Sequence, residues 1–180
     1  AINEGYHAIG SIINVKNSPR NISIQKASDL FNKIPPFITS VAVTVPNSIN
    51  DIKFIEESVH PDVIQIHGIF EEDFFKNVRE EISTKLINAL LINTKNESQI
   101  LDKNPIKAAN ILRKYSNAII IDKYIFNKFG GTGTTVNWEL AKKIRENIDT
   151  PIILGGGLDE DNVVEAINTL KPHAIDVSSW

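Results

Sequence analysis

The chain has 180 residues, 42% of them hydrophobic, which fits one domain with its own core. Its 19 basic and 22 acidic residues give a net charge of −3, and no basic cluster indicates a nucleic-acid surface. The absence of a long apolar run, of a signal-peptide pattern and of cysteine predicts a cytoplasmic protein without a membrane span, disulfide or thiolate site. The four histidines lack metal-ligand spacing, so we expect no metal.

Apolar runs of strand length alternate with stretches in which apolar residues recur every three or four positions, which predicts alternating strands and helices. The seven expected strands span residues 8–14, 39–45, 62–66, 86–92, 118–121, 151–154 and 174–177. The six expected helices have apolar faces within residues 27–34, 52–59, 74–82, 108–112, 140–148 and 163–170. Regular strand spacing of roughly 25 to 30 residues is typical of an open doubly wound sheet or a TIM (β/α)₈ barrel.

The two ends of the pattern favour the barrel. The first strand follows a short segment that reads as the end of a helix, and the sequence stops just after the seventh strand. We therefore expect residues 1–180 to form a single barrel domain that is incomplete at both ends, without its first strand and its last helix.

The stretch Ala118–Leu140 is the first site candidate. A β-branched run ends at Asp122, and the glycine loop Gly130–Gly133 then leads into an amphipathic helix. Parallel α/β proteins place their chemistry at such carboxyl ends of strands. An aspartate at a strand end also has a structural reading, in which it accepts backbone hydrogen bonds in the following turn.

Two further loops follow the next strands along the chain, namely Gly155–Gly157 and the pair Ser178 and Ser179. Glycines let backbone N–H groups approach an anion closely, and serine adds a hydroxyl donor. In a barrel these loops are neighbours of Gly130–Gly133, so we expect a bound phosphate monoester. The alternative is that the glycines only make tight turns between strand and helix.

Three other side chains have open interpretations. Arg20 follows the first strand and is either a surface residue or a clamp for a carboxylate. Strand alternation sends Gln65 and His67 to one side, where His67 lies in the barrel mouth or is a hydrogen-bonded structural histidine. Asp176 is expected inside, either in a structural network or as a substrate ligand.

Several segments together resemble phosphoribosylanthranilate isomerase of tryptophan biosynthesis. They are V-K-N-S-P-R-N-I-S, D-V-I-Q-I-H-G, I-I-I-D followed by G-G-T-G-T-T-V-N-W, L-G-G-G-L-D-E-D-N-V and I-D-V-S-S. The likeness covers essentially the whole chain. It implies a cofactor-free Amadori rearrangement of N-(5-phosphoribosyl)anthranilate to 1-(2-carboxyphenylamino)-1-deoxyribulose 5-phosphate. We expect a monomer or homodimer, and the composition predicts neither nucleic-acid nor membrane partners.

The resemblance also implies roles for residues. Asp122 would be the general acid, and the family's general base is a cysteine, a residue type that this sequence lacks. Substrate-binding roles fall on Arg20, His67, Gly131, Gly156, Gly157, Asp176, Ser178 and Ser179. The alternatives are another phosphosugar barrel enzyme, such as indole-3-glycerol-phosphate synthase, and a barrel that binds phosphate without catalysis.

Overall fold

The computed structural model describes residues 2–124 and 135–178. The chain divides into two compact units. Unit 1 contains Ala1–Gly68 and Lys76–Ile87, and unit 2 contains Ile69–Phe75 and Asn88–Trp180. Two elements are shared between the units, namely helix α3 (Glu72–Glu81) and strand β5 (Lys85–Ile92).

Unit 1 carries parallel strands in the order β2-β1-β3-β4. These are β1 (Ala8–Ile13), β2 (Asn21–Ile22), β3 (Thr39–Thr44) and β4 (Val63–Ile66). In the register, Ala8 of β1 lies opposite Thr39 of β3, and Val41 of β3 lies opposite Val63 of β4. The short helix η1 (Ile2–Glu4) precedes β1.

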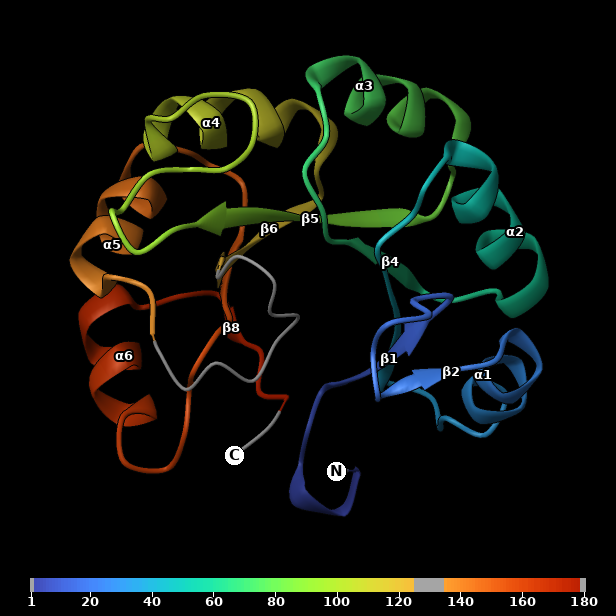
Figure 1. Cartoon of the computed structure of the whole chain (residues 1–180). Coiled ribbons are helices and arrows are strands. Elements are labelled where there is room, and N and C mark those ends of the chain that lie inside the picture. The colour runs from blue at the N-terminus through green and yellow to red at the C-terminus, as the bar shows by residue number, and fades with distance from the viewer. Residues whose placement is uncertain (1, 125–134, 179–180) are drawn as a thin grey trace. The chain divides into compact units, whose positions relative to one another are not determined.

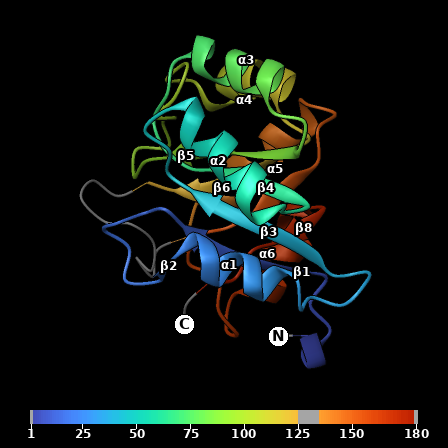
Figure 2. The same ribbon diagram turned by 90° about the vertical axis from the view of Figure 1, so that its right-hand side faces the viewer.

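Two helices cover this part of the sheet, α1 (Ile24–Phe31) and α2 (Ile49–Val59). The side chain of Ser23 caps α1 by accepting the backbone N–H of Lys26. The helix α2 buries Ile52, Ile55 and Val59, which recur at helical spacing on one face. Figure 2 shows α1 and α2 side by side in front of β1 and β3.

Unit 2 continues with strands in the order β5-β6-β7-β8, and the pairs β6/β7 and β7/β8 are parallel. These strands are β6 (Ala118–Lys123), β7 (Ile152–Leu154) and β8 (Ala174–Ile175). The helices are α4 (Pro105–Leu112), η2 (Arg113–Tyr115), α5 (Trp138–Glu146) and α6 (Val163–Leu170). Figure 1 shows α4, α5 and α6 following one another along one face of these strands.

The core of unit 2 forms between these helices and strands. Ile119, Ile121 and Ile152 are fully buried in one cluster with Ile144 of α5 and Leu170 of α6. The segment Ile69–Phe75 joins this unit because Phe75 is buried in the same cluster and Phe70 and Phe74 pack against it. Apolar burial thus holds the ends of β6 and β7 in place.

The structure confirms the α/β class, the parallel strands and the six expected helices. The expectation of seven strands was wrong. The described residues contain eight, because the short strand β2 pairs with β1 at Ile12 and Ile13. A strand of two residues has no apolar run or alternation that could reveal it. Closure into a barrel stays a prediction. No helix in the described ranges combines the length and apolarity that crossing a membrane requires.

Candidate active site

Asp122 stands where a buried strand ends. Ile119, Ile120 and Ile121 of β6 are 0% exposed, and Asp122 after them is half-buried. Its Oδ1 accepts the backbone N–H of Lys123 at 2.7 Å. One carboxylate oxygen therefore fulfils the structural role that the sequence left open, and it fixes the side chain at the carboxyl end of β6.

The loop after β7 lies directly against this carboxylate. The backbone N–H of Gly155 donates to the carbonyl oxygen of Ile121 at 3.0 Å, which continues the pairing of β6 and β7. Gly156 follows with φ +76°, and a Cβ placed on it would lie 2.5 Å from Asp122 Oδ1 and 3.0 Å from the nitrogen of Lys123. Only glycine fits there, both for its backbone conformation and for the close approach of Asp122.

Gly157 extends the same loop with φ +68°. Its carbonyl oxygen accepts the side-chain N–H of Asn162 at 2.9 Å, and Asn162 Oδ1 accepts the backbone N–H of Asp159 at 3.1 Å. These bonds hold the loop against the N-terminus of α6. Asn162 was missed in the sequence, although the polar run D-E-D-N before a helix is a signal for side-chain hydrogen bonds to the backbone.

Asp176 and Ser178 follow β8. The backbone N–H of Asp176 donates to the carbonyl oxygen of Leu154 at 2.8 Å, so the chain still runs along β7 at this point. The expectation of a buried Asp176 was wrong, because the residue is exposed, as are both residues of β8 and Ser178. The physical reason is that β8 ends the strand order of the described residues, with β7 on one side and no described strand on the other.

Two site candidates belong to unit 1. Arg20 is half-buried in the turn before β2, where its backbone N–H donates to Ser18 Oγ at 3.3 Å. His67 follows β4, and its Nε2 lies 2.8 Å from Nε2 of the buried Gln65. The prediction that Gln65 and His67 point to the same side is confirmed.

Three carboxylates away from these strand ends are firmly hydrogen-bonded, and the sequence did not single them out. Asp62 Oδ2 accepts the hydroxyl and the backbone N–H of Ser40, which lower the pKa of Asp62. Burial raises the pKa of Glu56, but hydrogen bonds from Thr84 and Ser83 outweigh it and leave that pKa lowered.

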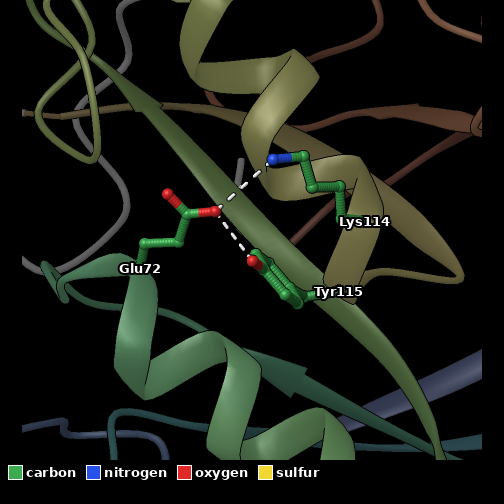
Figure 3. Close-up of polar contacts among 3 residues, drawn as sticks. All are labelled: Glu72, Lys114 and Tyr115. Atoms are coloured by element: carbon green, nitrogen blue, oxygen red, sulfur yellow. Dashed lines mark hydrogen bonds and ion pairs between the residues drawn. The ribbon is translucent and has the colours of Figure 1, made fainter.

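The third of these carboxylates lies in unit 2. Figure 3 shows Glu72 Oε1 accepting the hydroxyl of Tyr115 at 2.7 Å, with Lys114 Nζ at 3.5 Å. The hydrogen bond from Tyr115 lowers the pKa of Glu72, burial opposes it, and the charge of Lys114 lowers it further. Tyr115 ends η2, which leads into the amino end of β6, whereas Asp122 lies at the other end of that strand.

The comparisons with known proteins decide the family. The family model described as N-(5'phosphoribosyl)anthranilate (PRA) isomerase matches residues 2–180. The chain belongs to this isomerase family. It is 40% identical to the N-(5'-phosphoribosyl)anthranilate isomerase of Methanocaldococcus jannaschii over 182 residues, which cover 99% of this chain and 80% of the relative.

Solved structures of isomerases of this family are also similar. The enzyme from Thermotoga maritima is 26% identical with a TM-score of 0.79, covering 98% of this chain and 79% of its own. A second structure is 24% identical with a TM-score of 0.76, covering 99% and 78%. It is a complex with reduced 1-(o-carboxyphenylamino)-1-deoxyribulose 5-phosphate, and at this identity it supports the fold alone.

Among the candidate residues of this isomerase-family chain, the structure brings Asp122 and Gly156 into contact within unit 2. Gly157, Asp176 and Ser178 lie in the same unit, after β7 and β8. Arg20 and His67 lie in unit 1. Gly131 and Ser179 lie outside the described residues. Within residues 2–124 and 135–178, no three histidine or acidic side chains gather as a metal site.

Proposed function

We propose that this protein catalyses the Amadori rearrangement of N-(5'-phosphoribosyl)anthranilate to 1-(2-carboxyphenylamino)-1-deoxyribulose 5-phosphate, in tryptophan biosynthesis. Membership of the isomerase family supports the reaction. The observation that carries the residue assignment is the contact between Asp122 and the backbone of Gly156. It joins a carboxylate to a glycine loop at the carboxyl ends of adjacent parallel strands, where α/β enzymes bind phosphate and react.

In this proposal Asp122 is the general acid. Its carboxyl group protonates the ribose ring oxygen, the bond from that oxygen to C1 breaks, and the amine nitrogen lone pair forms a C1=N Schiff base. A base then removes the proton from C2, which gives an enolamine, and the enolamine tautomerises to the ketose. A positioned acid contributes about 10² to 10⁴ in rate. Asp122 is the one catalytic residue that we assign, since the family resemblance places a cysteine in the role of base and the sequence contains none.

The remaining site residues serve binding in this proposal. The backbone N–H groups of Gly156 and Gly157, with those of Gly131 and Ser179, hold the phosphate. Loops of this composition suit an anion because no Cβ atoms shield the N–H groups. Arg20 pairs with the anthranilate carboxylate, for which a guanidinium offers two parallel donors. His67, Asp176 and Ser178 contact the sugar.

Two measurements on the purified protein test this proposal. Decay of the fluorescence of phosphoribosylanthranilate reports turnover, and calorimetry with the reduced product analogue reports binding. We expect both, with inorganic phosphate competing for the analogue. Binding without turnover would identify a phosphate-binding barrel without catalysis. Turnover of the indole-forming step in place of the isomerisation would identify the neighbouring pathway enzyme.

A further inference from the structure

Asn162 stands directly before helix α6, but its side chain bonds to the loop that precedes the helix. An asparagine in this position ordinarily accepts the backbone N–H of the second or third helical residue. Within the described chain, the side chain of Asn162 makes no such bond to α6. Its Nδ2–H donates to the carbonyl oxygen of Gly157 at 2.9 Å, and its Oδ1 accepts the backbone N–H of Asp159 at 3.1 Å. Both ends of the amide therefore serve the loop between β7 and α6.

Asp159 holds Asn162 in this orientation. Its Oδ1 accepts the backbone N–H groups of Asp161 and Asn162, each at 3.1 Å, and its carbonyl oxygen accepts the backbone N–H of Val163 at 3.0 Å. Asp159 and Asn162 thus exchange hydrogen bonds between side chain and backbone in both directions. Turning the amide of Asn162 over would set its oxygen against the carbonyl oxygen of Gly157. The bonds therefore also fix which end of the amide meets the glycine.

The glycine loop after β7 is held at both of its ends. At the first end, the backbone N–H of Gly155 donates to the carbonyl oxygen of Ile121 at 3.0 Å. At the second end, Asn162 holds the carbonyl oxygen of Gly157. Gly156 and Gly157 have φ values of +76° and +68°. Because glycine has wide conformational freedom, two successive glycines keep one conformation only when their neighbours hold them, and Asn162 is such a neighbour.

The loop conformation that Asn162 holds presents two backbone donors. Within the part of the chain that the structure describes, the N–H groups of Gly156 and Gly157 donate to no protein acceptor, and both residues are only half-buried. Each peptide unit is a rigid plane, so fixing the carbonyl group of Gly157 restricts the directions of the neighbouring N–H groups. Successive backbone N–H groups in such a turn form a concave site for an anion. Asn162 thereby sets the direction of donors that it does not itself supply.

We infer that Asn162 is a positioning residue for phosphate recognition, which aims the N–H groups of Gly156 and Gly157 at a phosphate monoester. The inference rests on the proposed function, in which this loop binds the phosphate of the substrate. Because Asn162 holds the loop before the ligand arrives, binding does not have to order two glycines, which lowers the entropic cost of association. Loss of the asparagine side chain should therefore raise the dissociation constant for phosphate about tenfold or more.

NMR titration of the isotope-labelled full chain with inorganic phosphate tests this inference. In the parent, the amide resonances of Gly156 and Gly157 should shift as phosphate is added, and Asn162→Ala should raise the dissociation constant about tenfold. The matched control is Asn110→Ala in α4. Asn110 also lies in unit 2, and its Nδ2–H donates to the carbonyl oxygen of Ile106 at 3.1 Å, so this variant loses a similar bond and should bind phosphate as the parent does.

The titration separates failure of the inference from failure of the proposed function. An equal dissociation constant in Asn162→Ala and the parent overturns the role of Asn162 and leaves the phosphate site in place. A parent in which the resonances of Gly156 and Gly157 do not respond to phosphate refutes the phosphate site itself, and the role of Asn162 with it.

Asn162→Ser separates positioning of the loop from support of α6. Serine is a favoured residue before a helix, so this variant should stay folded, but its hydroxyl is too short to take the place of the amide at Gly157. We expect it to bind phosphate as weakly as Asn162→Ala. Amide relaxation should show increased motion at Gly156 and Gly157 and unchanged motion in α6. A serine variant with the phosphate affinity of the parent would show that Asn162 only supports the helix, and would overturn the inference.

Discussion

In unit 1, Glu56 and Asp62 each accept hydrogen bonds from a hydroxyl and a backbone N–H, and the pKa of each is lowered. Asp62 lies just before β4, and the partners of Glu56 lie just before β5. In unit 2, Asp122 comes at the carboxyl end of β6 and is bordered by the backbone of Gly156. The two carboxylates that form hydrogen bonds near the amino ends of strands thus connect elements, whereas Asp122 at the carboxyl end of β6 lies against a loop suited to an anion.

Of the substitutions considered, Asp122→Asn should have the largest effect, which is on kcat. We expect kcat to fall by about 10² to 10⁴, since an amide does not donate the proton. Binding of the reduced product analogue should persist, because the backbone loop is unchanged. The matched control is Asp149→Asn, an exposed aspartate before β7. Steady-state kinetics measures kcat and calorimetry measures binding, for both variants. An unchanged kcat in Asp122→Asn would show that Asp122 has a structural role only.

Gly156→Ala should have the second largest effect, which is a loss of both stability and activity. The new Cβ would meet Asp122 Oδ1 at 2.5 Å in a backbone with φ +76°, so we expect a loss of stability of about 1 to 3 kcal/mol, with loss of activity. Gly10→Ala in β1 is the control, since its Cβ would meet Val43 Cγ2 at an ordinary 3.5 Å. Urea unfolding compares the two, and equal effects would show that the contact with Asp122 is not tight.

Glu56→Ala tests the structural carboxylates of unit 1. It leaves the N–H groups of Ser83 and Thr84 without this acceptor, at a cost of about 1 to 2 kcal/mol. Because the folded pKa of Glu56 is below its ordinary 4.5, its stabilisation is present above that pH and is lost as pH falls through the folded pKa. Urea unfolding from pH 7 to pH 3 measures this loss of stability. The control is Glu57→Ala, which changes the exposed neighbour and should leave the pH dependence of the parent protein unaltered. A parent and variant of equal stability at pH 7 would refute the structural role.

Tyr115→Phe should have the smallest effect. It removes the hydroxyl bonded to Glu72 while the ring stays, so the pKa of Glu72 should rise toward its ordinary value. Lys114→Ala should raise that pKa less, because the hydrogen bond is the larger cause. Carboxyl-carbon NMR titration measures both variants. The opposite ranking would make charge the main influence on Glu72.

Much of the fold was predictable because its signals are local. The run Ile119–Ile121 and the helical spacing of Ile52, Ile55 and Val59 each specify an element from a few neighbouring residues. The strand β2 was not predictable, because two residues gain their strand character only by pairing with Ile12 and Ile13. Exposure of Asp176 likewise depends on which strands flank β8.

By itself, the sequence determined the α/β class, the positions of the main strands and helices, and the residue types at the strand ends. Only the tertiary structure placed Gly156 within contact of Asp122, and only it surrounded Glu56 with Ser83 and Thr84. The physical reason is that spacing along a chain reports local backbone preferences. Contacts between residues tens of positions apart depend on strand order, register and packing.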